Sequence, residues 1–129
     1  MTVALWCVLV ASALPYLFVV IAKADPSFIK GNRNKDPRVY EAGLTGFRQR
    51  AYWTHLNTLE ALPPFAAAVL VAHYTGAEQG SVDLLARGFI LCRLLYGLFY
   101  IVNRDMLRSL IWAGGMACVV GLFVVSAMA

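Results

Sequence analysis

Four long runs of apolar residues constrain this chain more than any other feature, because each is long enough to cross a lipid bilayer. A transmembrane helix needs about 20 predominantly apolar residues, and the runs cover residues 2–22, 47–74, 82–102 and 107–127. They are continuous and do not alternate with polar residues, which disfavours the strands of a membrane barrel. The sequence therefore predicts an all-α integral membrane protein, a single domain with four spans and a loop at residues 23–46.

Composition and the first run support this assignment. The chain is 60% hydrophobic and only 14% charged, whereas an ordinary soluble domain is about 25% charged. The alternative for residues 2–22 is a cleaved signal peptide, but this run lacks a basic n-region, is too long and has no clear cleavage site. We expect it to remain as a membrane span.

Basic residues predict the orientation. Of the 11 Lys and Arg residues, seven lie between the first two runs or at the start of the second, and the connection HYTGAEQGSVD after the second run has none. The seven are Lys23, Lys30, Arg33, Lys35, Arg38, Arg48 and Arg50. Loops rich in Lys and Arg stay in the cytoplasm, so we expect a cytoplasmic loop at 23–46 and both termini on the periplasmic or lumenal side.

The sequence contains little that indicates a nucleic-acid or metal site. The net charge of +4 follows from the loop asymmetry, and no nucleic-acid motif is present. The cysteines, Cys7, Cys92 and Cys118, stand singly inside apolar runs, and His55 and His73 are too scattered for a metal cluster. We expect neither kind of partner.

The segment RAYWTHLNTLEALPPF, residues 50–65, interrupts the second run with polar side chains. Several residues follow helical spacings of three and four and therefore share one face: Arg50, Trp53, Asn57, Glu60 and Pro64. An ionised glutamate facing lipid costs several kcal/mol, so Glu60 needs a partner.

The third run supplies that partner in Arg93, which shares a helix face with Tyr96 and Tyr100. We expect the two polar faces to meet, with Glu60 paired to Arg93 and with Asn57 and the two phenols completing a hydrogen-bond network. One interpretation is purely structural, because buried polar pairs often fix the register of packed helices. The other is that these residues line a binding site.

Arginines near the basic end of the spans allow the same two interpretations. Arg50, Tyr100, Arg104 and Arg108 would surround a cavity that opens toward the cytoplasm. Such arginines can be an ordinary topology signal. They also suit a small anion, because guanidinium groups match carboxylates well.

Three motifs together resemble the MAPEG family, the membrane-associated proteins of eicosanoid and glutathione metabolism. They are RAYWTHLNTLEALPPF, the RLLYGLFY run from Arg93 to Tyr100, and RSL at Arg108. The resemblance covers nearly the whole chain. It implies a homotrimer of four-helix bundles with glutathione, the cosubstrate, bound between neighbouring subunits near the cytoplasmic face.

The resemblance also implies residue roles. By position, glutathione contacts are expected from Arg38, Arg50, Asn57, Glu60, Arg93, Tyr96, Tyr100 and Arg104. A catalytic role at the thiol is expected for Arg108 and Ser109, and Arg104 and Arg108 could exchange roles. Trp53 stands where the eicosanoid enzymes carry another arginine, so the pattern is closer to bacterial members whose substrates are undefined.

The expected function is a glutathione-dependent transferase or peroxidase of the bacterial inner membrane that acts on lipophilic electrophiles or lipid hydroperoxides. One alternative is a non-catalytic trimer that binds lipid or another membrane protein. Another is an ion or proton path, which is less favoured because the polar stripe stops near Glu60 and Arg93.

Overall fold

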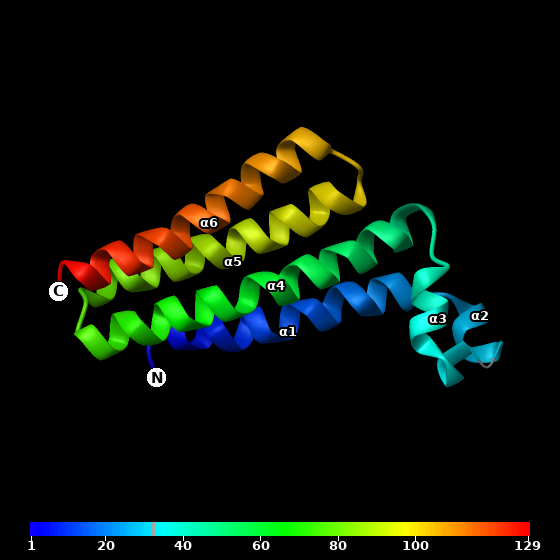
Figure 1. Ribbon diagram of the computed structural model, residues 1–129, viewed down its shortest axis with the longest axis horizontal. Coiled ribbons are helices and arrows are strands. Elements are labelled where there is room, and N and C mark those ends of the chain that lie inside the picture. Colours follow the sequence, from blue (N-terminus) through cyan, green and yellow to red (C-terminus); the bar gives the residue numbers. More distant parts are fainter. Residues whose placement is uncertain (32) are drawn as a thin grey trace.

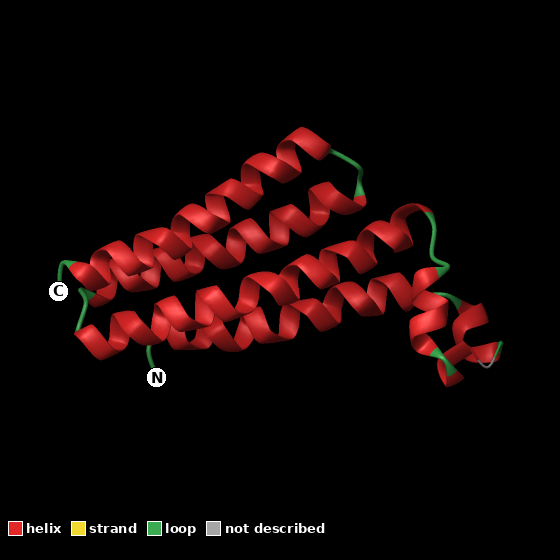
Figure 2. Cartoon of the chain, viewed as in Figure 1, coloured by secondary structure: helices red, strands yellow, loops and turns green. Residues whose placement is uncertain are grey.

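The computed structural model describes residues 1–31 and 33–129, which form helices joined by short connections (Figure 2). The four long helices are α1 (Val3–Lys23), α4 (Gly46–Thr75), α5 (Gln79–Ile101) and α6 (Asp105–Ala127). They occupy the four apolar runs. The segment between α1 and α4 is not a plain loop, because it contains α2 (Pro26–Lys30), the 3-10 helix η1 (Arg33–Lys35) and α3 (Pro37–Ala42).

Three of the described helices, α1, α5 and α6, are long and apolar enough to cross a membrane. The 30-residue helix α4 is the longest, but the polar residues between Arg50 and Glu60 reduce its mean hydropathy. At about 1.5 Å per residue, α4 is longer than the bilayer core of about 30 Å.

The long helices pack as two antiparallel pairs, α1 with α4 and α5 with α6 (Figure 1). Contacts of α4 with α5 and α6, and of α1 with α5, join the pairs. Many of the buried residues are alanines, which allow helices to approach closely in a membrane. Larger side chains fill the centre, where the Phe65 and Phe89 rings stack with centroids 4.0 Å apart.

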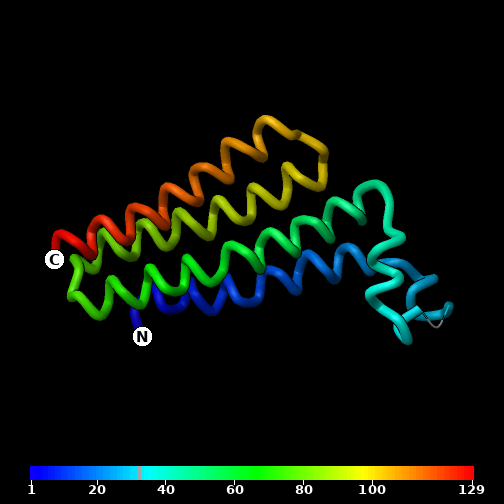
Figure 3. Tube along the Cα trace, viewed as in Figure 1, coloured from blue at the N-terminus to red at the C-terminus, as the bar shows by residue number. Residues whose placement is uncertain are grey.

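Short turns connect the long helices. At the end of α4, Gly76 adopts a left-handed conformation with φ of 73°. The Glu78 carboxylate then accepts hydrogen bonds from the backbone N–H groups of Gly80 and Ser81 and caps α5. Between α5 and α6, Asn103 has φ of 62°, a region that asparagine tolerates better than most residues. The tube in Figure 3 shows how this turn places the start of α6 beside the end of α5.

Polar contacts fasten the apolar helices at both ends. At one end, Asp83 of α5 accepts a 2.8 Å hydrogen bond from the Ala4 N–H of α1. At the other end, the buried Glu41 of α3 forms a 2.7 Å ion pair with Lys23 of α1. Burial alone would raise the pKa of Glu41, but hydrogen bonding and the charge of Lys23 outweigh it and lower the pKa below the ordinary value. Glu41 is therefore held as a carboxylate that ties the short helices to α1.

His55 has a structural contact in the middle of the fold. Its buried ring places Nδ1 2.7 Å from the Pro15 carbonyl oxygen and so joins α4 to α1. Among residues 1–31 and 33–129, no group of three metal-binding side chains is present.

Candidate functional site

Glu60 and Trp53 of α4 lie on the face that a single chain leaves open. Ala51, Thr54 and Thr58 on the other face are buried. By contrast, Trp53 is 43% exposed, and Glu60 is exposed as well. The helical spacing thus separates a packed face from a polar face, as expected for a site completed by something outside the single chain.

Arg93 of α5 is the largest fully buried side chain. Its Nη1 donates a 2.9 Å hydrogen bond to Asn57 Oδ1 of α4, and its guanidinium carbon lies 4.4 Å from the Tyr96 ring centroid. The other two nitrogens, Nε and Nη2, have no hydrogen-bond partner in the described part of the chain. Arg93 is thus a desolvated cation stabilised by one amide oxygen and by aromatic faces.

The predicted direct pair between Glu60 and Arg93 is wrong for a single chain. No ion pair joins the two side chains in the part of the chain that the structure describes. Asn57 lies between them, because its Nδ2 donates to Glu60 Oε2 at 3.4 Å while its Oδ1 accepts from Arg93. The physical reason is position: Asn57 is the residue of α4 whose amide oxygen reaches Arg93, whereas Glu60, three residues later, remains on the exposed face.

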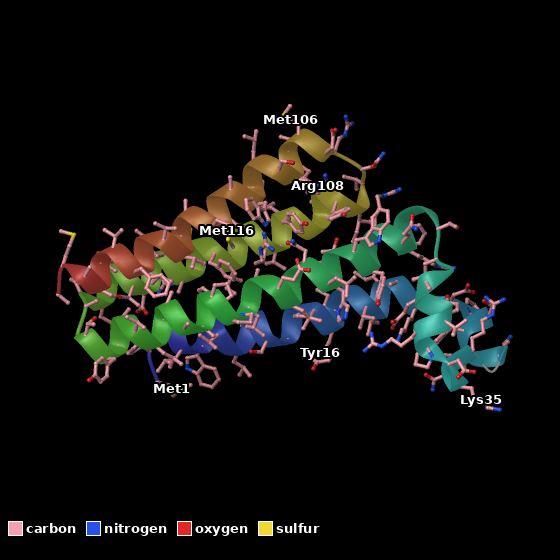
Figure 4. All side chains as sticks on the ribbon, in the orientation of Figure 1. Met1, Tyr16, Lys35, Met106, Arg108 and Met116 are labelled. Atoms are coloured by element: carbon pink, nitrogen blue, oxygen red, sulfur yellow. The ribbon has the colours of Figure 1, made fainter. Side chains whose placement is uncertain are left out.

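Aromatic rings continue the cluster toward α6. Tyr96 and Tyr100 pack edge to face with centroids 5.5 Å apart, and Trp53 of α4 lies 6.3 Å from Tyr100. Arg108 of α6, labelled in Figure 4, places its guanidinium 4.4 Å from the Tyr100 ring centroid. Three helices therefore meet around Tyr100, with the half-buried Arg108 at the edge of the cluster.

Arg50 joins the same end of the cluster through the backbone. Its Nε donates a 3.0 Å hydrogen bond to the Ile101 carbonyl oxygen, in the last turn of α5. The last carbonyls of a helix have no partner within the helix, so Arg50 serves as a cap for α5. Part of its guanidinium is thereby committed to the fold.

The structure brings together most of the predicted site residues and leaves three apart. The residues brought together are Arg50, Asn57, Glu60, Arg93, Tyr96, Tyr100 and Arg108. Arg38 lies on α3, where its exposed side chain pairs with Glu41. Arg104 and Ser109 are both exposed, and in the described residues no hydrogen bond links either side chain to the cluster. Within the described part of a single chain, the side chains of these three residues therefore make no hydrogen bond or ion pair to the cluster.

Sequence reasoning missed Gly115 of α6, which lies beside Arg93. A Cβ atom at Gly115 would lie 3.7 Å from Arg93 Nη2, an ordinary van der Waals contact, so this approach does not itself require glycine. The adjacent pair Gly114–Gly115 in an apolar run was the available signal, because small residues mark close helix contacts in membranes. The pair alone does not say which side chain approaches it.

The cluster combines cations, a carboxylate, an amide and phenols, which range from the buried Arg93 and Tyr96 to the exposed Glu60. Guanidinium groups bind carboxylates, and a carboxylate such as that of Glu60 binds ammonium groups. The arrangement suits a small polar molecule that carries both kinds of charge, held beside an apolar surface.

Comparison with known proteins gives one family. The model of the MAPEG family matches residues 3–128, a stretch that contains all four long helices and the whole cluster. No curated protein matches the chain.

Proposed function

The chain belongs to the MAPEG family of integral membrane proteins, and on this premise we propose that it is a glutathione-dependent transferase or peroxidase acting on lipophilic electrophiles or lipid hydroperoxides. The observation that carries the proposal is the position of Arg108, 4.4 Å from the Tyr100 ring at the edge of a cluster built by three helices. A thiol placed beside Arg108 would lie between a polar site and the apolar surface of the helices.

The proposed assembly is a homotrimer in which α1, α4, α5 and α6 of each subunit cross the membrane as a four-helix bundle. The exposed Glu60 supports it, because an ionised carboxylate does not face lipid without a large cost. A neighbouring subunit would cover Glu60 and Trp53 and complete the glutathione site. We place the basic segment 23–46 in the cytoplasm and both termini in the periplasm of a bacterial inner membrane, because basic loops remain on the cytoplasmic side.

Glutathione carries two carboxylates, an ammonium group and a thiol, and the cluster offers a partner for each. Arg50 and Asn57 would bind carboxylates, and Glu60 would accept the ammonium group. A free thiol has a pKa near 8.5, which an adjacent cation lowers. A lowering of one unit corresponds to about 1.4 kcal/mol, which a single guanidinium group such as that of Arg108 can supply.

The thiolate would then react with an apolar acceptor that enters from the bilayer. With an electrophile, the sulfur forms a bond to carbon and the leaving group departs with its electron pair. With a lipid hydroperoxide, the sulfur takes the terminal oxygen with its hydrogen and becomes a sulfenic acid, the O–O bond breaks, and the lipid alkoxide takes up a proton from solvent. A second glutathione thiol then attacks the sulfenic acid, which yields glutathione disulfide and water.

The test compares Arg108→Ala with Arg104→Ala in purified protein. Arg104 is the matched residue, because it lies one turn earlier and is exposed. We expect Arg108→Ala to raise the apparent pKa of bound glutathione, measured by ultraviolet thiolate absorption, and to reduce turnover at neutral pH about tenfold. Partial recovery of turnover at high pH would show that Arg108→Ala acts by reducing the fraction of thiolate. Arg104→Ala should retain the ultraviolet thiolate signal.

The second candidate function is a non-catalytic trimer that binds lipid or another membrane protein. Two observations favour it. Arg50 already donates a hydrogen bond to the Ile101 carbonyl oxygen, and Trp53 stands at a position where the eicosanoid enzymes carry an arginine, so fewer guanidinium groups remain to bind glutathione. If millimolar glutathione produces neither a thiolate signal nor a shift in melting temperature, this second function replaces the first.

A further inference from the structure

A cavity of about 550 Å³ lies away from the proposed glutathione site, between the short helices and the start of α4. Charged side chains line it, namely Asp25, Arg33, Asp36 and Arg48, together with Tyr40 and Leu44. None of these residues belongs to the cluster around Tyr100. The cavity therefore calls for a separate explanation.

The position of the cavity corresponds to the surface of the membrane. It lies where α1, a helix able to span the bilayer, ends at Lys23 and where α4 begins at Gly46. Figure 1 shows α2 and α3 beyond these ends, on the side of α1 away from α5 and α6. A molecule in the cavity would therefore lie at the level of the lipid headgroups.

The surface around the cavity combines apolar and basic side chains. Ile29 is 82% exposed and Val39 is 74% exposed, and Lys30 and Lys35 are exposed nearby. Residues 23–50 contain seven basic and three acidic residues, a net charge of +4. This combination is typical of segments that lie on anionic lipid, where apolar side chains enter the interface and basic ones bind headgroups.

Within the wall, Arg33 is the cation that remains available. Arg48 is neutralised, since its Nη1 donates to Asp25 Oδ2 at 2.8 Å. Arg33 Nη1 donates only to the Ser27 hydroxyl, at 3.3 Å, and no carboxylate in the described residues lies within ion-pair distance of it. Its guanidinium lies 5.7 Å from the Tyr40 ring, which orients it without neutralising it.

Two further groups near this wall, Tyr40 Oη and Arg48 Nε, have no hydrogen-bond partner in the described part of the chain, but both atoms are fully enclosed. Arg33 is therefore the group that can reach an anion in the cavity, and a phosphate group supplies several acceptor oxygens for it. Asp36 opposes an anion, but Asp36 and Arg33 are both exposed, so solvent screens both charges and contacts with the acyl chains have to contribute to binding.

We propose that this cavity binds the phosphate group of an anionic glycerophospholipid, with Arg33 as the main anion-binding residue. Ile29 and Val39 then contact the upper part of the acyl chains. The site does not depend on glutathione binding, so a negative result for lipid binding would not affect the proposed enzyme activity, and the reverse also holds.

The experiment measures lipid binding to the purified protein by native mass spectrometry in a neutral detergent. Phosphatidylglycerol and phosphatidylcholine of equal chain length are titrated separately. We expect tighter binding of phosphatidylglycerol, and an affinity about tenfold weaker in Arg33→Gln, since a charge-assisted hydrogen bond is lost. An unchanged melting temperature of Arg33→Gln without added lipid shows that the variant is folded.

Lys35→Gln is the matched control. It removes the same charge from the same segment, but Lys35 does not line the cavity; Figure 4 labels it among the short helices. The control should bind phosphatidylglycerol almost as the unchanged protein does. Equal losses in the two variants would mean diffuse attraction to a basic surface and would overturn the site.

A competition experiment tests whether the bound phosphate group belongs to a lipid or to a free phosphate compound. Inorganic phosphate and glycerol phosphate are added as competitors at the concentration of the lipid. The proposal requires that neither displaces phosphatidylglycerol at this concentration, because the acyl chains contribute to binding. Displacement by either, or equal affinity for the two lipids, would overturn the assignment to an anionic phospholipid.

Discussion

At the scale of single residues, the environment of Arg93 explains why the second apolar run contains an asparagine. A buried guanidinium carries a large desolvation cost unless it is paired or hydrogen-bonded. Among the described residues, Asn57 supplies the one hydrogen bond to Arg93, and the Tyr96 ring supplies a favourable face. Asn57 in turn donates to Glu60, so a buried cation is linked through a neutral amide to an anion on the open face.

Asn57→Ala should therefore destabilise the protein strongly. It removes the only hydrogen-bond acceptor of Arg93 in the described residues, and leaving a buried charge unpaired costs about 3–5 kcal/mol. Asn57→Asp retains an acceptor at the same position and should be much less harmful. Thermal unfolding in detergent measures both, and equal losses in the two variants would show that Arg93 finds its stabilisation elsewhere.

Glu41 should make stability depend on pH. Its folded pKa is lowered from 4.5, so its contribution is complete above about pH 4.5 and is lost as the pH falls through the lower folded value. Glu41→Gln should be less stable at neutral pH and should lose less on acidification below pH 4.5. Melting curves recorded between neutral and acidic pH test this, and parallel pH profiles for the two proteins would assign the dependence to other groups.

At the scale of helices, close approach controls the packing of α1 on α5. A Cβ atom built at Gly97 would lie 2.3 Å from the Phe18 ring. Phe18 is itself 4% exposed, so it has little room to move. Gly97 is therefore required by contact between two helices, not by its own backbone conformation.

Gly97→Ala should destabilise the bundle by about 1–3 kcal/mol, the usual cost of overpacking. Gly114→Ala is the control, because its Cβ would lie 3.4 Å from Cys92 Sγ, an ordinary contact. Melting temperatures in one detergent give the comparison. A second change, Phe18→Leu, should restore part of the loss in Gly97→Ala, and its failure to do so would place the clash elsewhere.

The elements differ in how far the sequence predicted them. Apolar runs of bilayer length located the four long helices, because a membrane span is encoded locally by composition. The short helices α2 and α3 were missed, since helices of five and six residues are not stable alone. They depend on distant contacts such as Lys23 with Glu41, which no local pattern reveals.

The same distinction applies to the candidate site. Helical spacing correctly placed Asn57 and Glu60 on one face and Arg93 on another helix. It could not decide which side chain reaches Arg93, because that depends on the offset between α4 and α5. The cap that Arg50 provides to Ile101 was unpredictable for the same reason, since the two residues are joined only by the tertiary fold.

At the scale of the whole molecule, a single chain leaves its polar face uncovered. Glu60 and Trp53 are exposed on α4, a helix that packs its other face against α1. In a membrane this face must meet lipid or protein, and the two environments have opposite consequences for a carboxylate. Exposing the ionised carboxylate of Glu60 to lipid costs several kcal/mol, whereas a neighbouring subunit can supply hydrogen bonds to it.

Glu60→Leu distinguishes these two environments by whether it lowers or raises the melting temperature. If a second copy covers Glu60, the variant loses interface contacts, and we expect a lower melting temperature and partial dissociation from three 14.2 kDa chains to one. If Glu60 faces lipid, the same change removes a misplaced charge and should raise stability. Light scattering in mild detergent measures the mass, with Leu70→Ala as control, since Leu70 is 58% exposed on the same helix. Because it creates no buried unpaired group, Leu70→Ala should leave the mass unchanged. A Glu60→Leu variant that is monomeric and more stable than the unchanged protein would refute both the trimer and the shared glutathione site.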